Sequence, residues 1–329
     1  MQLEQLGEKA RGLVKGNKAA VVTDENVEKL YLGRCVESLH NAGFEVYSFT
    51  VAPGEQSKSG ETYLSLLEFL AEIPLTRADV LVALGGGVVG DLTGFAAATY
   101  LRGIPVIQVP TTLLAAVDSS IGGKTAINLT AGKNLAGAFH QPVFVLRDAA
   151  LLDTLPSEIY KDGMAEVIKY GVLTGRELFE LLFDKEKAAR ETERIIERCS
   201  EIKLSYVEKD EHDTGIRQLL NLGHTIAHAV EKATDYRVSH GSAVAKGMAA
   251  ISDISAKQGW CSRKTAESIR LLLKTYGFDL EIEQSKEVLY EIMKTDKKRK
   301  GGVIDIVIPE EIGRCRLQRI TIEELYELL

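Results

Sequence analysis

The sequence predicts an α/β N-terminal domain with a mostly parallel, Rossmann-like sheet, followed by an all-α C-terminal domain. Three observations support this fold class. The chain has 329 residues, more than the roughly 250–300 at which a single hydrophobic core stops growing. Strand-like and helical patterns alternate over residues 1–150, whereas helical patterns dominate residues 151–329. Because no flexible linker separates the two parts, we expect them to pack closely around a cleft.

Five short apolar runs in the first domain are expected to be strands, and helical patterns separate them. Continuous apolar runs of this length are typical of strands that are buried on both faces. Strands that alternate with helices form βαβ units, whose strands run parallel. The expected strands are 18–23, 44–51, 80–84, 104–109 and 142–146, and the expected helices include 25–42 and 58–72.

The second domain is expected to consist of helices, because residues 157–294 show almost only helical periodicity. A single short strand is expected close to the C-terminal end. The expected helices are 160–173, 177–208, 225–234, 242–258 and 263–276, and the expected strand is 303–308.

Composition and charge exclude several classes of protein. With 45% hydrophobic and 26% charged residues, the chain has the ordinary make-up of a globular protein. The net charge of −7 argues against a nucleic-acid partner, because the only dense basic run, residues 297–300, is short and typical of a solvated turn.

The cysteine pattern and the apolar runs indicate a cytoplasmic protein without a membrane segment. The four cysteines are scattered and form no C-x-x-C pair, which argues against a disulfide framework and a cysteine zinc site. We see neither a signal peptide nor about 18 consecutive apolar residues.

A glycine-rich turn follows the third expected strand, with the sequence Gly-Gly-Gly-Val-Val-Gly-Asp over residues 85–91. This matches G-x-G-x-x-G, a weak signal that gains weight from the strand before it and the helix after it. Glycine lets the backbone approach a pyrophosphate, and the helix N-terminus favours an anion. The alternative is a tight turn without a ligand. Because the turn follows the third strand rather than the first, an ordinary Rossmann fingerprint is not the template.

Three polar segments follow within a short stretch, residues 109–112, 118–125 and 132–134. Two of them place a glycine beside a lysine, Lys124 and Lys133. Backbone donors combined with a point charge suit an anionic ligand. The alternative for each lysine is ordinary exposure on a loop.

Three of the six histidines, His224, His228 and His240, lie within seventeen residues. His224 and His228 are four apart and share one helical face. Two histidines and a carboxylate are a common zinc set, and Glu166 is the carboxylate candidate because it lies among apolar residues on an expected helix. The alternative is an ion pair between Glu166 and Lys169 beside two hydrogen-bonded helix histidines.

Arg217 and Asn221 precede the histidines at spacings that continue the same stripe, four, three and four residues apart. Such a polar stripe is a poor core and is better interpreted as an active-site wall. Lys203 lies one helix earlier, where exposure to solvent is an equal alternative.

At this point the sequence resembles the 3-dehydroquinate synthase family, in colinear order over nearly the whole chain. The resemblance rests on residues 85–95, 100–103, 109–112, 117–120, 122–125, 132–134, 154–156, 165–169, 221–225, 240–241 and 296–298. It implies an NAD-binding α/β domain and a helical metal domain with the active site between them.

The resemblance also implies a role for individual residues. The metal, Zn²⁺ or Co²⁺, would be bound by Glu166, His224 and His240. His228 would act in proton transfer, and the other catalytic residues would be Asp118, Lys169, Lys203 and Asn221. Substrate would be bound by Arg102, Lys124, Lys133, Asn134, Arg217 and Lys297. NAD would be bound by Asp24, Asn26, Glu55, Lys58, Gly86, Gly87, Val88, Asp91, Thr111, Thr112 and Thr154.

The implied reaction converts 3-deoxy-arabino-heptulosonate 7-phosphate to 3-dehydroquinate and phosphate. It proceeds by transient oxidation with NAD, phosphate elimination, reduction and an intramolecular aldol closure. The family is usually dimeric, and Arg102 would reach a phosphate site that includes a partner subunit.

The chain departs from the family pattern in two places. Ser242 stands where the family commonly has glutamate, which leaves open what contacts the metal ligands from behind. Ala227 replaces a frequent glycine, a change that favours helix.

Three other functions remain open. A related sugar phosphate cyclase would share the fold, NAD and metal but change the residues that contact carboxylate and phosphate. A metal-dependent alcohol or glycerol dehydrogenase would not need the lysine-rich segments and would form net NADH. A non-catalytic binding protein would tolerate the loss of Lys169, Lys203 or His228, all of which are present.

Overall fold

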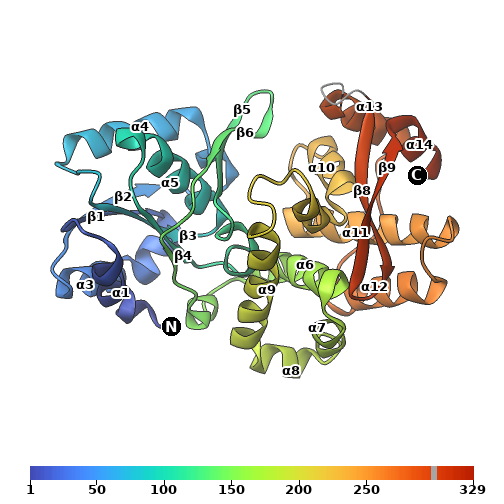
Figure 1. The fold of residues 1–329 in the computed structure, drawn as a ribbon, viewed down its shortest axis with the longest axis horizontal. Coiled ribbons are helices and arrows are strands. Elements are labelled where there is room, and N and C mark those ends of the chain that lie inside the picture. Colours follow the sequence, from blue (N-terminus) through green and yellow to red (C-terminus); the bar gives the residue numbers. More distant parts are fainter. Residues whose placement is uncertain (298–301) are drawn as a thin grey trace. The chain divides into compact units, whose positions relative to one another are not determined.

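The computed structural model describes residues 1–297 and 302–329 (Figure 1), and for residues 295–297 it describes the backbone alone. The described chain forms two compact units, Met1–Pro156 and Ser157–Leu329. Among the described residues, no helix has both the length and the apolar content needed to cross a bilayer.

The first unit contains the predicted parallel sheet, with five strands in the order β2-β1-β3-β4-β7. All five predicted strands are present, although the last is only two residues long. Their bounds are β1 (Lys18–Asp24), β2 (Glu45–Val51), β3 (Val80–Gly85), β4 (Val106–Pro110) and β7 (Phe144–Val145).

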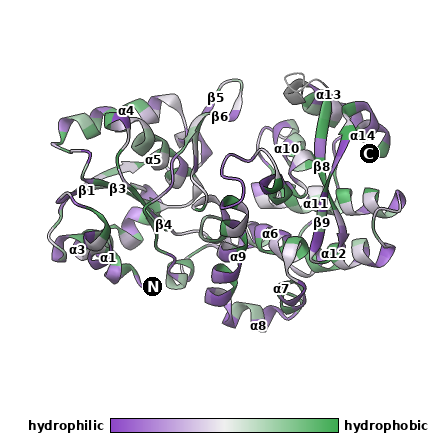
Figure 2. Cartoon of the chain, viewed as in Figure 1, coloured by the Kyte–Doolittle hydropathy of each residue, from purple (hydrophilic) through white to green (hydrophobic). Residues whose placement is uncertain are grey.

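Helices cover both faces of this sheet, which explains why β1 and β3 are buried almost throughout, whereas the edge strand β2 is largely accessible. On β3, Val80 and Val82 face a core formed with α1 and α3, while Leu81 and Ala83 face a core formed with α4 and α5. Figure 2 shows α4 with hydrophilic and hydrophobic residues along its length, as expected for a helix with one face on a sheet. The helices are α1 (Leu6–Leu13), α2 (Glu25–Val27), α3 (Gly33–Asn41), α4 (Gly60–Glu72) and α5 (Gly87–Thr99), with shorter turns η1 (Leu3–Gln5), η2 (Glu28–Leu32), η3 (Glu55–Ser57), η4 (Tyr100–Arg102), η5 (Ala115–Ser119) and η6 (Ala149–Leu152).

An antiparallel hairpin, β5 (Lys124–Leu129) with β6 (Gly132–Phe139), forms a separate sheet that the sequence analysis did not predict. Its glycines and lysines had indicated loops. The hairpin packs on α5 through Thr125, whose side chain occupies the space that a side chain at Gly94 would need. Its polar outer positions are therefore compatible with a strand, because only one face is buried.

The second unit is helical, as predicted. The strand expected at 303–308 is one half of an antiparallel hairpin, β8 (Val303–Glu311) with β9 (Arg314–Thr321). The long helix expected at 177–208 was wrong: three helices occupy this region, and the second begins where Asp184 accepts a hydrogen bond from the Lys187 amide. The helices are α6 (Ser157–Thr174), α7 (Arg176–Leu181), α8 (Lys185–Arg190), α9 (Thr192–Val207), α10 (His224–Ala233), α11 (His240–Lys257), α12 (Arg263–Thr275), α13 (Lys286–Lys297) and α14 (Ile322–Leu328).

Candidate active site

Glu166 lies in the middle of α6 and is completely buried. Its carboxylate forms an ion pair with Lys169, which is also buried, one turn further along the helix. Neither carboxylate oxygen accepts a well-directed hydrogen bond from the described residues. A buried carboxylate is costly unless its oxygens are engaged, and beside the ion pair with Lys169 the carboxylate of Glu166 still has capacity for another partner.

Two histidines converge on this carboxylate, and each is the first residue of its helix. His224 begins α10 and His240 begins α11. Their Nε2 atoms lie 3.5 and 3.3 Å from Oε1 of Glu166, respectively. One potential ligand atom from each of the three residues lies within 4.8 Å of the others. The structure thus brings together the three residues that the sequence analysis assigned to a metal.

The opposite nitrogen of each ring also has a contact. Nδ1 of His224 lies 3.1 Å from the carbonyl oxygen of Leu222, and Nδ1 of His240 lies 3.6 Å from Oε1 of Glu231. A proton on each Nδ1 leaves the Nε2 lone pairs directed toward Glu166, the arrangement usual for metal-binding histidines. The sequence analysis missed Glu231. Its signal was present, because Glu231 follows His228 by three residues and extends the same helical face.

Charges in this cluster perturb the pKa of two of its members. Burial opposes ionisation of Glu166, but Lys169 and the two histidines outweigh it and hold the pKa well below its ordinary value. Burial likewise opposes protonation of His240, but hydrogen bonding to Glu166 and Glu231 raises its pKa to about 10. Without a metal ion, a protonated His240 would therefore lie between the two carboxylates, with Glu166 at its Nε2 and Glu231 at its Nδ1.

These residues fit a divalent metal ion. Two imidazole nitrogens and one carboxylate oxygen form a set that suits Zn²⁺ or Co²⁺, and three protein ligands leave a position for substrate. The available lone pairs of Glu166 and the orientation of both imidazole rings agree with one metal ion bound by all three residues.

The stripe predicted from residue 217 to residue 228 was wrong as a continuous helix. Arg217 and Asn221 belong to a 3-10 turn, η7 (Ile216–Asn221), and Gly223 separates them from α10 with φ of 79°. A side chain at Gly223 would collide with the backbone of Met248 on α11, so close packing of the two helices imposes the break.

The four polar residues around this break have different environments. Arg217 and Lys203 are buried, and Arg217 donates to the carbonyl oxygen of Glu211. Asn221 and His228 are exposed, and the His228 ring lies 5.6 Å from the His224 ring in an edge-on arrangement. The side chain of Lys297 lies outside the described residues.

In the first unit, the glycine turn joins β3 to α5 as the sequence predicted. A Cβ on Gly86 would lie 2.9 Å from Cγ2 of Thr112, and a Cβ on Gly87 would lie 3.0 Å from Oγ of Ser119. Gly86, Gly87 and Val88 are only half-buried. Neither glycine has a positive φ, so an unusual backbone conformation does not explain them. They instead allow Thr112 and Ser119 to lie close to the backbone of the turn.

Several side chains assigned to NAD contact one another or their own backbone. Lys58 contacts the carboxylate of Asp91 and the side-chain oxygen of Asn134. Asp24 accepts hydrogen bonds from the amides of Asn26 and Val27 at 2.9 and 3.2 Å, and so caps the helix that follows β1.

Two threonines assigned to NAD help to shape this region. The Thr111 amide donates to the Gly85 carbonyl at 3.0 Å, which joins β4 to the glycine turn. The Thr154 hydroxyl lies 2.6 Å from the hydroxyl of Tyr31, a buried residue that the sequence analysis missed. No polar pattern marks Tyr31, because it lies within an amphipathic helical segment.

The hairpin carries part of the predicted substrate-binding set. Asn128 ties it to η3, because its side chain donates to Oε1 of Glu55 at 2.7 Å and accepts from the Asn134 amide at 3.0 Å. Lys133 lies 3.9 Å from the same Glu55 oxygen, and Lys124 is exposed at the start of β5. Asn128 is a second residue that the sequence analysis missed.

The two remaining residues of the predicted site lie on turns. Arg102 is exposed in η4 with φ of 68°, and Asp118 is half-buried in η5.

The fold is shared by sugar phosphate cyclases and iron-containing alcohol dehydrogenases. A solved 2-deoxy-scyllo-inosose synthase, in complex with carbaglucose-6-phosphate, NAD⁺ and Co²⁺, matches 99% of this chain and 93% of its own, with a TM-score of 0.88 and 26% identity. An iron-containing alcohol dehydrogenase matches with a TM-score of 0.67 and 15% identity, over 99% of this chain and 93% of its own, which shows the fold alone. The parallel sheet with its glycine turn and the helical unit with its Glu-His-His set agree with this class.

Sequence comparison places the chain within one family of this class. The sequence profiles described as 3-dehydroquinate synthase N-terminal and C-terminal match residues 48–162 and 163–299. Relatives named 3-dehydroquinate synthase from Clostridium acetobutylicum and Enterococcus faecalis are 42% and 44% identical, each over 99% of this chain and 93% of the relative. One from Nostoc punctiforme is 45% identical over 94% of this chain and 88% of the relative. The chain belongs to the 3-dehydroquinate synthase family.

Proposed function

We propose that this chain is an NAD- and metal-dependent lyase that converts 3-deoxy-arabino-heptulosonate 7-phosphate to 3-dehydroquinate and phosphate. The observation that carries the proposal is the convergence of Glu166, His224 and His240 within 4.8 Å in a chain of this family. A buried carboxylate and two oriented imidazoles suit a cation that would contact a hydroxyl-rich substrate.

In this proposal the first unit binds NAD at the turn between β3 and α5. The half-buried Gly86 and Gly87 allow the pyrophosphate to approach the backbone, and the N-terminus of α5 favours its charge. When bound, NAD would accept and return a hydride, and Zn²⁺ or Co²⁺ would act as a Lewis acid at the substrate hydroxyls.

Basic side chains are proposed to bind the two anionic groups of the substrate. The planar guanidinium of Arg217 can bind a carboxylate through two parallel hydrogen bonds. Lys124 and Lys133 on the hairpin and Arg102 suit the phosphate, since lysine acts as a point charge on phosphate oxygens. Lys297 and Asn134 complete the proposed substrate-binding set.

Proton transfer is assigned to His228, whose ring is exposed beside His224. Imidazole is the side chain most often used as a general acid or base in enzymes. Lys169, through its ion pair with Glu166, holds positive charge next to the metal ligands. Asp118, Lys203 and Asn221 are proposed to orient the reacting groups.

The proposal includes a homodimer in the cytoplasm. The four cysteines are all free thiols, which suits a reducing compartment. Arg102 is exposed on a turn, where it is available to a second copy of the chain. Light scattering of the purified protein tests the dimer.

The function is tested in one assay with the heptulosonate phosphate and NAD, in which phosphate release and NADH absorbance are followed together. The expected result is stoichiometric phosphate and dehydroquinate without net NADH, and loss of activity with a chelator. Absence of phosphate release from metal-loaded protein would contradict the proposal. Net NADH from a simple polyol would instead indicate a dehydrogenase, and activity on another sugar phosphate a related cyclase.

A further inference from the structure

Asp162 connects the two helices that carry Glu166 and His240. It lies on α6 four residues before Glu166, so the two carboxylates share one side of that helix. Its side chain reaches the start of α11, whose first residue is His240. We propose that Asp162 is a positioning residue that fixes the backbone of His240 relative to Glu166, and this inference rests on the metal site of the proposed function.

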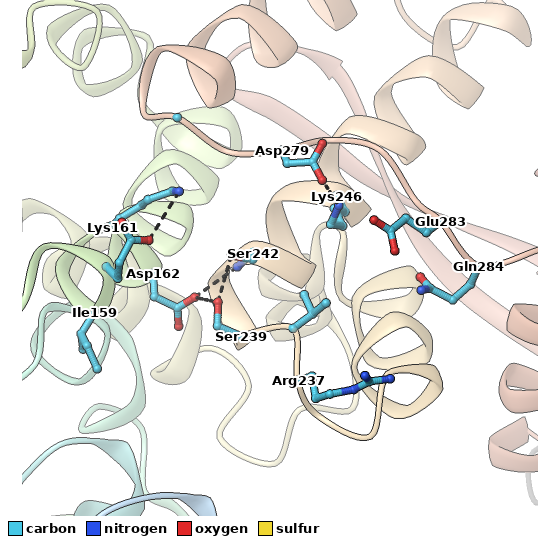
Figure 3. A pocket seen from close by; sticks show the side chains of 13 residues that line it. Ile159, Lys161, Asp162, Arg237, Ser239, Ser242, Lys246, Asp279, Glu283 and Gln284 are labelled. Atoms are coloured by element: carbon cyan, nitrogen blue, oxygen red, sulfur yellow. Dashed lines mark hydrogen bonds and ion pairs between the residues drawn. The ribbon is translucent and has the colours of Figure 1, made fainter.

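The contacts of Asp162 are directed at the residues on both sides of His240 (Figure 3). Oδ1 of Asp162 accepts a hydrogen bond from the Ser239 hydroxyl and another, of 3.2 Å, from the Ser242 amide. The hydroxyl oxygens of Ser239 and Ser242 lie 2.9 Å apart. One carboxylate oxygen thus holds the residue before the metal ligand and the residue two positions after it.

These contacts cap the N-terminus of α11. Ser239 is the N-cap residue of α11, but its side chain caps none of that helix's amides. The Ser242 amide occupies the third helical position, which an N-cap side chain ordinarily satisfies. Asp162 supplies the acceptor from a different helix, and its negative charge at the N-terminus of α11 is favourable.

Gly241 makes this close contact possible. A Cβ at this position would collide with the backbone carbonyl of Asp162. Any larger residue would therefore push the start of α11 away from α6. The approach is a packed contact between backbones, and it brings the Asp162 side chain within reach of Ser239 and Ser242.

Ser242 also has a role in this arrangement. It is one of the two residues at which the sequence departs from the pattern of its family, and its amide donates to Asp162 at the start of α11. The contacts around His240 come from two other helices: Asp162 on α6 accepts a hydrogen bond from the Ser242 amide, and Glu231 on α10 lies beside the His240 ring. The glutamate expected after His240-Gly241 is therefore not needed to hold this ligand.

The inference is tested by metal affinity, measured without substrate or NAD. Zn²⁺ and Co²⁺ are titrated against a chromophoric chelator into metal-free wild type, Asp162→Ala and Asp162→Asn. We expect Asp162→Ala to weaken both affinities by about tenfold, the lower end of the effect of an outer contact, and to change the Co²⁺ absorption spectrum. Asp162→Asn keeps an oxygen that can accept both hydrogen bonds, so it should stay within about threefold of wild type.

Glu158→Ala is the matched control, because Glu158 lies four residues before Asp162 on the same helix and its exposed side chain pairs with Lys161. It should leave metal affinity and spectrum unchanged. Should Asp162→Ala fail to fold, Ser239→Ala removes one of the two hydrogen bonds and is expected to weaken affinity by about threefold.

The outcomes separate this inference from the proposed function. If Asp162→Ala lowers thermal stability but binds both metals with wild-type affinity and spectrum, Asp162 is merely structural and the inference is wrong. If Asp162→Asn binds metal as weakly as Asp162→Ala, the charge of Asp162 rather than its hydrogen bonds supports metal binding. The proposed positioning role would then be wrong. If wild type binds neither metal, the metal site itself fails, and the inference fails with it.

Discussion

The two candidate ligand regions of this molecule are built in opposite ways. In the first unit, several polar side chains assigned to NAD contact each other or their own backbone, as Lys58 does with Asp91 and Asp24 does with two amides. In the second unit, Glu166 directs its oxygens at two histidines without a well-directed hydrogen bond. The proposed nucleotide site depends on glycines that let a ligand approach the backbone, whereas the candidate metal site depends on the chemistry of a few side chains.

The first and largest test of this difference is Glu166→Gln. The substitution keeps the shape but removes the charge, so metal affinity should fall by more than about 100-fold, beyond the effect of an outer contact. Lys169 would lose its buried partner, which should lower the free energy of unfolding by about 3 kcal/mol. NAD affinity should not change. Chelator competition, thermal unfolding and NAD titration measure the three effects.

Glu180→Gln is a suitable control for this experiment, because Glu180 lies on α7 with an exposed side chain paired to Arg176. It should change none of the three quantities. A parallel loss of NAD and metal binding in Glu166→Gln would show that the two regions are not independent.

A second test uses pH. The pKa of His240 is raised to about 10 by Glu166 and Glu231, from an ordinary 6.5, so a metal ion must displace this proton. Apparent metal affinity should therefore rise by about tenfold per pH unit between pH 7 and 9. In the metal-free protein the same proton stabilises the fold: this contribution is complete below pH 6.5 and is lost as pH rises through about 10.

Glu231→Gln sharpens the pH test. Without the Glu231 charge the pKa of His240 should be lower, so the rise in metal affinity should level off at a lower pH. Chelator competition at several pH values, with proton release measured by calorimetry in two buffers, follows both proteins. An affinity that is constant across this range would show that His240 binds metal without losing a proton.

A third test addresses the glycine turn with Gly86→Ala. The new Cβ would lie 2.9 Å from Cγ2 of Thr112, so the turn must shift where the pyrophosphate is proposed to bind. We expect NAD affinity to fall about tenfold, or about 1.4 kcal/mol, with metal affinity unchanged. Gly60→Ala is the control, because a Cβ there meets nothing within 4 Å. Wild-type NAD affinity in Gly86→Ala, measured by fluorescence titration, would argue against binding at this turn.

The same contrast explains what the sequence could predict. The parallel sheet was predictable because its inner strands, β3 above all, are apolar runs that need cover on both faces and alternate with helical patterns. The histidines stood out because three of the six lie within seventeen residues, whereas Glu166 lies far from them in sequence and the choice of His240 over His228 came from the family resemblance. In both cases the informative pattern is local or rests on rare residues.

What the sequence could not predict depends on contacts between distant segments. The break at Gly223 follows from packing against Met248 on α11, and glycine within an apolar helical pattern does not reveal such a neighbour. In the sequence, nothing distinguishes Asp162 from other polar helix residues, because its partner at the start of α11 is distant along the chain. The hairpin was missed because its buried positions face α5, a partner that periodicity alone cannot identify.

The smallest expected effect concerns the side chains of the first unit. Asn128→Ala removes the hydrogen bonds to Glu55 and to the Asn134 amide that tie the hairpin to η3. Each contributes about 1 kcal/mol, so the hairpin should open more easily by about 1–2 kcal/mol, measured by hydrogen exchange of β5 and β6 amides. If NAD binds mainly to the backbone of the glycine turn, the NAD affinity of Asn128→Ala should stay within about twofold of wild type. Asn41→Ala, at the exposed end of α3, is the control. A loss of NAD affinity as large as that expected for Gly86→Ala would mean that side chains of the hairpin, and not the glycine turn alone, build the nucleotide site.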